Sequence, residues 1–136
     1  MNSRINLMDL SQPSSFLRLA LLADATVSGV TGLAMMLGAG VVDGLLGVPG
    51  VLLRYAGLSL LPFAALVAFL ATRENLSRPA AWAAVAYNAL WAVDSIVLMA
   101  SGWIAPTALG YAFIVFQALV VAIFAKLQYI GLRMAA

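Results

Sequence analysis

Hydrophobic residues gather in four long runs along the chain, at residues 16–39, 49–72, 79–101 and 106–129. Each run is longer than the ~20 residues that an α-helix needs to cross the ~30 Å hydrocarbon core of a bilayer. The connections between the runs are short, and helices joined by short loops pack side by side in opposite directions. The pattern therefore predicts an all-α integral membrane protein, a four-helix antiparallel up-down bundle.

The remaining residues bound this single transmembrane domain, which we place at residues 16–130. We expect a polar N-terminal tail at residues 1–15 and a short C-terminal tail at residues 131–136, both cytoplasmic. The stretch of residues 38–50 is too rich in glycine for a continuous helix, so we expect an apolar loop that lies along the membrane interface. Asp24 in the first run, and the lack of a small-x-small cleavage site after it, argue against a removable signal peptide. The later spans each begin beside a proline, which suits the first turn of a helix: Pro49, Pro79 and Pro106.

Composition narrows the chemistry that the chain can perform. Hydrophobic residues make up 65% of it and charged residues only 9%, whereas a soluble domain carries about 25% charge. The chain has no Cys and no His, which removes disulfides, thiolate nucleophiles, imidazole bases and the usual ligands of zinc and haem. We therefore expect no enzymatic activity, no cofactor and no metal site.

The charges indicate orientation more than a binding partner. The net charge is +2, but the cations form no patch or run, so no nucleic-acid partner is expected. Cations concentrate on cytoplasmic sides of membrane proteins. In a four-span topology all but one fall on one side, which predicts that both termini are cytoplasmic: Arg4, Arg18, Arg73, Arg78, Lys126 and Arg133.

Polar side chains inside the predicted spans are the main candidates for function. A charge at the centre of a spanning helix costs about 2.5 to 3.5 kcal/mol in insertion experiments, so it needs a partner or a purpose. Asp24 and Ser28 lie one turn apart and share a face of the first span. Asn88 lies at a similar depth in the third span, and Gln117 lies near the middle of the fourth. We expect these four residues to form one hydrogen-bonded cluster.

A second polar layer is predicted in the outer half of the spans. Arg54 and Asp94 lie at similar depths there, so we expect them to form an ion pair. Tyr87 and Trp91 lie one turn apart on the face of the third span that carries Asn88 and Asp94. These two rings are candidates to line a ligand cavity, or they fill the core of the bundle.

The buried polar residues have two interpretations. They hold the helices together, as interhelical hydrogen bonds commonly do where lipid removes the hydrophobic driving force. Alternatively, Asp24 binds and releases a proton during transport, because intramembrane acids often lie on proton pathways. In that case Asp24→Asn would abolish the activity without unfolding the protein.

Several short segments resemble a group of small bacterial inner-membrane proteins with four helices and no established activity. The likeness rests on Ala-Asp-Ala at residues 23–25, Arg-Tyr-Ala-Gly-Leu at 54–58, Asn-Ala-Leu-Trp at 88–91, Ser-Gly-Trp at 101–103 and Leu-Gln-Tyr-Ile-Gly-Leu-Arg at 127–133. It covers most of the chain after Phe16. The resemblance implies a bacterial inner-membrane location and a tetraspan topology, and it implies no function.

Three classes of function remain open. We favour a non-catalytic accessory or interaction subunit, which assembles in the lipid bilayer with copies of itself or with a larger membrane complex. A homo-oligomeric transporter or channel for a small solute or ion, with Asp24 as its proton-linked site, is the alternative. An enzyme or a carrier of a lipid-like molecule comes third. One four-helix bundle is thin for enclosing a pathway, so transport would require at least a dimer.

Overall fold

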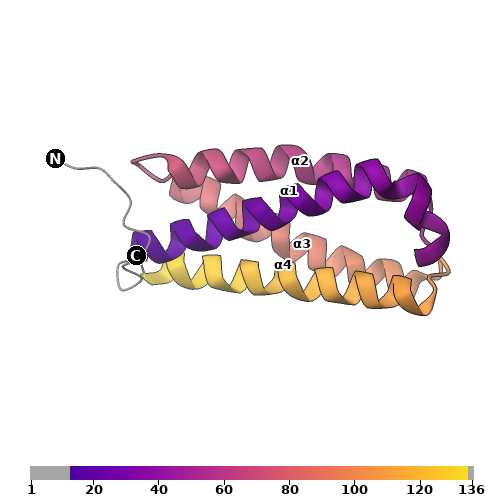
Figure 1. The fold of residues 1–136 in the computed structure, drawn as a ribbon. Helices are drawn as coiled ribbons and strands as arrows, with labels where there is room; N and C mark the ends of the chain where they lie inside the picture. Colours follow the sequence, from indigo (N-terminus) through magenta and orange to yellow (C-terminus); the bar gives the residue numbers. More distant parts are fainter. Residues whose placement is uncertain (1–12, 135–136) are drawn as a thin grey trace.

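The computed structural model describes residues 13–134, which form four α-helices and, within those residues, no β-strand. All four helices are long and apolar enough to cross a membrane. The protein is therefore an all-α integral membrane four-helix bundle, as the hydropathy pattern predicts (Figure 1). The helices are α1 (Pro13–Leu46), α2 (Gly50–Thr72), α3 (Arg78–Ser101) and α4 (Ala108–Met134).

The helices alternate in direction, but they do not pack evenly. In Figure 1, α1 crosses from beside the end of α4 to beside the start of α2. Extensive contacts join α1 to α2 and to α4, and join α3 to α4, whereas α2 and α3 barely touch. The expectation that consecutive helices pack as neighbours thus fails for one pair. The separation of α2 and α3 leaves one side of the bundle open.

Helix α1 is longer than the sequence pattern predicts. It begins at Pro13 and continues through most of the glycine-rich stretch to Leu46, so the prediction of an interfacial loop at residues 38–50 was wrong. An apolar environment offers no water to unpaired backbone groups, which favours helix even where glycine propensity is poor. Gly47 ends the helix with a positive φ of 65°, and its N–H donates to the carbonyl of Asp43 at 2.9 Å. Only residues 47–49 form the turn.

The end of α1 is fastened to the start of α4. The Thr107 hydroxyl donates to the carbonyl of Leu45 at 2.6 Å, and the Thr107 N–H donates to the carbonyl of Leu46 at 3.0 Å. A Cβ on Gly110 would collide with the Leu46 carbonyl oxygen, so this approach requires glycine. In Figure 1 the last turns of α1 accordingly bend across the end of the bundle towards α4.

The other helix boundaries follow local signals. Pro49 is the N-cap residue of α2, and the Ser77 hydroxyl accepts a hydrogen bond from the Ala80 N–H at the start of α3. Gly102, at φ 79°, ends α3. Helix α4 runs to Met134, beyond the predicted end of the fourth span. Of the expected tails, residues 1–12 and 135–136 lie outside the described part of the chain.

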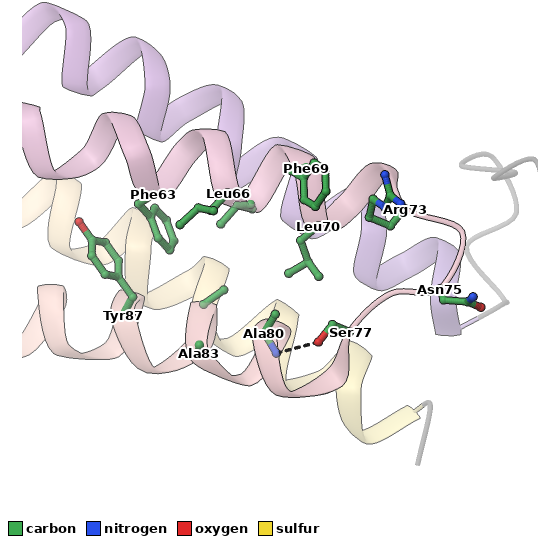
Figure 2. Close-up of a pocket in the computed structure, with 12 residues that line it drawn as sticks. Phe63, Leu66, Phe69, Leu70, Arg73, Asn75, Ser77, Ala80, Ala83 and Tyr87 are labelled. Atoms are coloured by element: carbon green, nitrogen blue, oxygen red, sulfur yellow. Dashed lines mark hydrogen bonds between the residues drawn. The ribbon is translucent and has the colours of Figure 1, made fainter.

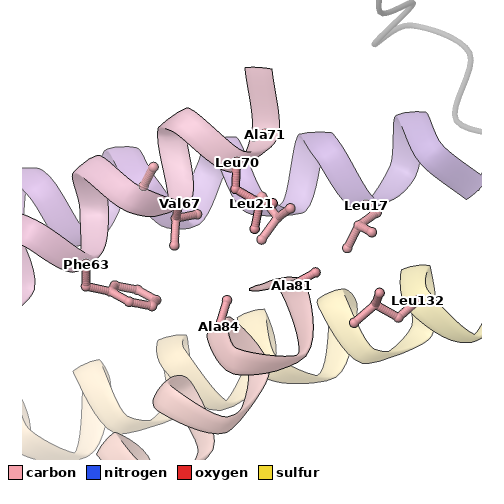
Figure 3. Close-up of a cluster of buried hydrophobic side chains, with 10 residues drawn as sticks. Leu17, Leu21, Phe63, Val67, Leu70, Ala71, Ala81, Ala84 and Leu132 are labelled. Atoms are coloured by element: carbon pink, nitrogen blue, oxygen red, sulfur yellow. The ribbon is translucent and has the colours of Figure 1, made fainter. Parts of the chain in front are cut away.

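Two apolar clusters fill the bundle, one towards each end. The first joins all four helices at the end where α1 begins and α4 finishes, and Figure 3 shows its side chains pointing into the bundle. The second lies towards the opposite end, where Gly32 of α1 and Gly57 of α2 meet backbone to backbone. The first cluster consists of Leu17, Leu21, Ala25, Phe63, Val67, Leu70, Ala71, Ala81, Ala84 and Leu132.

Candidate functional site

A fully buried hydrogen-bond network centred on Asp24 is the candidate functional site. Oδ1 of Asp24 accepts a hydrogen bond from the Ser28 hydroxyl at 2.9 Å. Oδ2 accepts one from Asn88 Nδ2 and one from Gln128 Nε2, each at 2.7 Å. Asn88 Nδ2 also donates to Gln128 Oε1 at 3.1 Å. The network, which we call the Asp24 cluster, ties α1, α3 and α4 together at one depth.

The surroundings of the Asp24 carboxyl limit what it can do chemically. All its hydrogen-bond donors are uncharged, and the side chains of Asp24, Asn88 and Gln128 have almost no exposed surface. Oδ2 accepts two N–H bonds from α3 and α4, and Oδ1 accepts the Ser28 hydroxyl of its own helix. The arrangement therefore suits a clamp between helices.

The structure brings together three of the four residues of the predicted cluster. Asp24, Ser28 and Asn88 lie together as expected, but Gln117 is absent and Gln128 takes its place. The two glutamines are eleven residues apart, which is three turns, so they share a face of α4. Sequence periodicity could not separate them. Gln128 was overlooked because the fourth span was expected to end at residue 129, which placed this residue at the membrane surface.

Gln117 instead builds a second, smaller network with α3. Its Oε1 accepts a hydrogen bond from the indole N–H of Trp91, and its Nε2 donates to the Ser95 hydroxyl at 2.9 Å. Ser95 in turn donates to the backbone carbonyl of Trp91 at 2.8 Å. These groups line a cavity of about 90 Å³. The cavity is small, and the polar groups around it already hydrogen-bond to one another.

Tyr87 lies between the Asp24 cluster and α2. Its ring stacks on Phe63 with centroids 3.9 Å apart, and its hydroxyl hydrogen-bonds to the Ser59 hydroxyl at 2.9 Å. Trp91 also stacks with Tyr87, with ring centroids 5.9 Å apart. Tyr87 thus makes one of the few bridges between α2 and α3. It lines a pocket between these helices, whereas Trp91 lines the small cavity at Gln117.

The expected ion pair between Arg54 and Asp94 is not formed. Both side chains are exposed on the surface of the bundle, and the Arg54 guanidinium lies against Gly40 of α1. Arg54 lies nine residues before Phe63, which is half a turn round α2, so it points away from α3. Asp94 immediately precedes the buried Ser95 and is rotated about 100° from it. The two residues lie at similar depths in the sequence pattern, but their side chains lie on faces of α2 and α3 that do not meet.

Arg18 has a role that the sequence did not reveal. The sequence pattern indicates only a topology signal at this position, yet the Arg18 side chain is buried and its guanidinium donates to the carbonyls of Ala71, Arg73 and Glu74. These carbonyls belong to the end of α2 and the loop after it, where unpaired acceptors and the helix dipole favour a cation. Arg78 similarly donates to the Leu132 carbonyl near the end of α4, at 3.2 Å. In the sequence, the feature that indicates such a cap is a Lys or Arg at the end of a predicted span.

Within residues 13–134 no three acidic side chains come together, and the chain has no Cys or His. Comparison with known proteins adds no further assignment. No family model matches the chain, and no curated protein and no solved structure matches it significantly. Function therefore has to be argued from the geometry alone.

Proposed function

We propose that the protein is a non-catalytic accessory or interaction subunit of a membrane assembly. It resides in a bacterial inner membrane with both termini cytoplasmic, and it binds copies of itself or a larger complex, with no nucleic acid involved. The distribution of cations supports this orientation. The closed Asp24 cluster supports a structural use of its polar groups, because each carboxyl oxygen already accepts at least one hydrogen bond from a buried donor.

The main observation that supports this proposal is the exposed side chain of Asp94. Its side chain is exposed on the surface of the bundle, seven residues before the end of α3 at Ser101. Seven residues place it about 10 Å along the helix from that end. An acid at such depth faces lipid unless protein covers it, and its short side chain reaches the interface less readily than Lys or Arg. A partner that covers this part of α3 removes that cost.

A second copy of the chain offers a suitable cation. Arg54 is also exposed and lies four residues after the start of α2 at Gly50, near the same end of the bundle. Because Arg54 points away from α3, Arg54 of one copy meets Asp94 of another through different surfaces of the two copies, in a head-to-tail contact. A larger complex with its own buried cation would serve equally. Both arrangements cover Asp94 on α3.

The proposal is tested by the mass of the protein after gentle extraction. The wild-type protein in mild detergent should run as an oligomer or with a larger partner, because the α3 surface needs cover. Asp94→Asn should shift it towards the monomer. Lys126→Gln is the matched control, since Lys126 is an exposed charge on α4 whose long side chain reaches the headgroups. A wild-type protein that leaves the membrane as a bare monomer would refute the proposal.

A further inference from the structure

The poorly packed side of the bundle contains an apolar groove between α2 and α3. Its volume is about 390 Å³, and Figure 2 shows its walls. Phe63, Leu66 and Leu70 of α2 face Ala80 and Ala83 of α3 across the gap. Small side chains on α3 opposite large ones on α2 leave room that neither helix fills. We call this space the α2–α3 groove.

The groove is closed at one end and polar at the other. Its inner end is blocked by Tyr87, which stacks on Phe63. Its mouth is formed by the loop between the helices, where Arg73, Asn75 and Ser77 line it. The Arg73 guanidinium lies over the Phe69 ring, 4.8 Å from the ring centroid. The occupant of such a site has one polar end and one apolar end.

The loop that carries Arg73 is held in place from within the bundle. Arg18 donates hydrogen bonds to the backbone carbonyls of Arg73 and Glu74, so the backbone at the mouth is tied to α1. The side chain of Arg73 remains exposed. A guanidinium presented from a fixed backbone on the edge of an apolar groove favours a phosphate, which it can bind through two parallel hydrogen bonds.

The length of the groove selects its occupant. Phe63 and Arg73 lie ten residues apart along α2, a distance of about 15 Å. That is half of the ~30 Å hydrocarbon core and thus the depth of one leaflet. A spanning helix of a partner would need a groove along the whole core. An acyl chain whose headgroup stays at the surface needs only this half.

We propose that the α2–α3 groove binds an anionic phospholipid, with one acyl chain between the helices and its phosphate at Arg73. The cation at the mouth selects for negative charge, since basic sites between spanning helices on the cytoplasmic side bind anionic headgroups. Ser77 adds a hydroxyl at the same edge of the groove. The inference goes beyond the proposed function and shares with it only the cytoplasmic orientation, because Asp94 lies towards the opposite end of α3.

Native mass spectrometry of the full-length protein in mild detergent tests this site, with phosphatidylglycerol and phosphatidylcholine titrated separately. The wild-type protein should retain phosphatidylglycerol in preference to phosphatidylcholine. Arg73→Gln should weaken phosphatidylglycerol binding about fivefold, the factor expected for one cation near the lipid surface, and leave phosphatidylcholine binding unchanged. Arg133→Gln removes an exposed cation at the same end of the bundle, outside the groove, and should change neither.

A second pair of variants tests the groove itself. Ala83→Trp fills it and should remove both lipids, whereas Ala89→Trp places the same bulk on an exposed part of α3 that does not line it. Equal retention of the two lipids by wild type, or equal losses in the Arg73 and Arg133 variants, would overturn the proposal. So would an Ala83→Trp protein that keeps its lipid but loses its oligomeric state, because a second copy would then be the occupant. The arginine variants keep the test decisive if Ala83→Trp fails to fold.

Discussion

The Asp24 cluster predicts an order of stabilities that depends on whether its acid carries a charge. Asn88→Leu removes one of the two donors to Oδ2, so an ionised carboxylate there would be left short of a partner. Asp24→Leu removes the carboxylate and leaves only neutral donors, of which Asn88 keeps its bond to Gln128. Stranding a charge costs more than stranding a neutral group. The Asn88 variant should therefore be the less stable of the two.

The magnitudes follow from the bonds lost. A hydrogen bond to a charged group contributes about 1.5 to 3 kcal/mol, so we expect Asn88→Leu to lower the free energy of unfolding by about 2 to 3 kcal/mol. Asp24→Leu loses two interhelical bonds, and such bonds in membranes average about 0.6 kcal/mol with a maximum near 1.7. Its expected loss is about 1 to 2 kcal/mol. The double variant has no carboxylate left to strand, although Gln128 loses both of its side-chain partners. Its loss of stability should therefore be smaller than the sum of the two single losses.

Equilibrium unfolding by titration with a denaturing detergent in mixed micelles measures these differences. Thr26→Val is the matched control, because the Thr26 hydroxyl bonds only within α1, to the carbonyl of Leu22, and its side chain is exposed. That variant should change the free energy of unfolding by less than about 0.5 kcal/mol. If Asn88→Leu cost no more than Asp24→Leu, the acid would be neutral in the cluster and the reasoning would be refuted. Losses equal to the control would remove the cluster from the stabilising contacts altogether.

Three further perturbations test other parts of the structure. Gly57→Ala should destabilise the protein by about 1 to 3 kcal/mol, because its Cβ would lie 2.6 Å from a carbonyl oxygen of α1, whereas Gly38→Ala meets open space and should be neutral or slightly stabilising in the same unfolding assay. Arg18→Gln should speed amide hydrogen exchange in residues 71–75, since the loop carbonyls lose their donors; unchanged exchange there would contradict its role as a cap. Asp24→Asn should leave the proton permeability of reconstituted vesicles as it is in wild type, and a specific loss of proton flux would instead favour the transport alternative.

The clamp at Asp24 also explains why its two interhelical donors are amides. Asn and Gln each carry two N–H donors and an oxygen acceptor, so a pair of them can bond to a carboxylate and to each other at once. That is the arrangement of Asn88 and Gln128 around Oδ2. A Lys or Arg in either place would add a charge that needs its own solvation in the core. Neutral donors satisfy the acid with no further buried charge.

The sequence by itself determined the membrane-spanning class, the number of helices and most of the Asp24 cluster. Backbone groups in lipid must bond within their own helix, so four apolar runs of sufficient length admit four helices and little else. The 3.6-residue period then placed Asp24 and Ser28 on one face, and a similar depth linked them to Asn88. These features depend only on the order and spacing of residues along the chain.

Only the tertiary structure decided what depends on how whole helices shift and rotate against one another. Periodicity assigns an angle around a helix axis, but it does not fix the depth of the helix, so it could not choose Gln128 over Gln117 three turns away. It also could not foresee that Arg54 faces α1 while Asp94 remains exposed. The α2–α3 groove arises in the same way. Helix α2 packs closely on α1 through Gly32 and Gly57 and makes few contacts with α3, and that choice of neighbour is a property of the packed bundle.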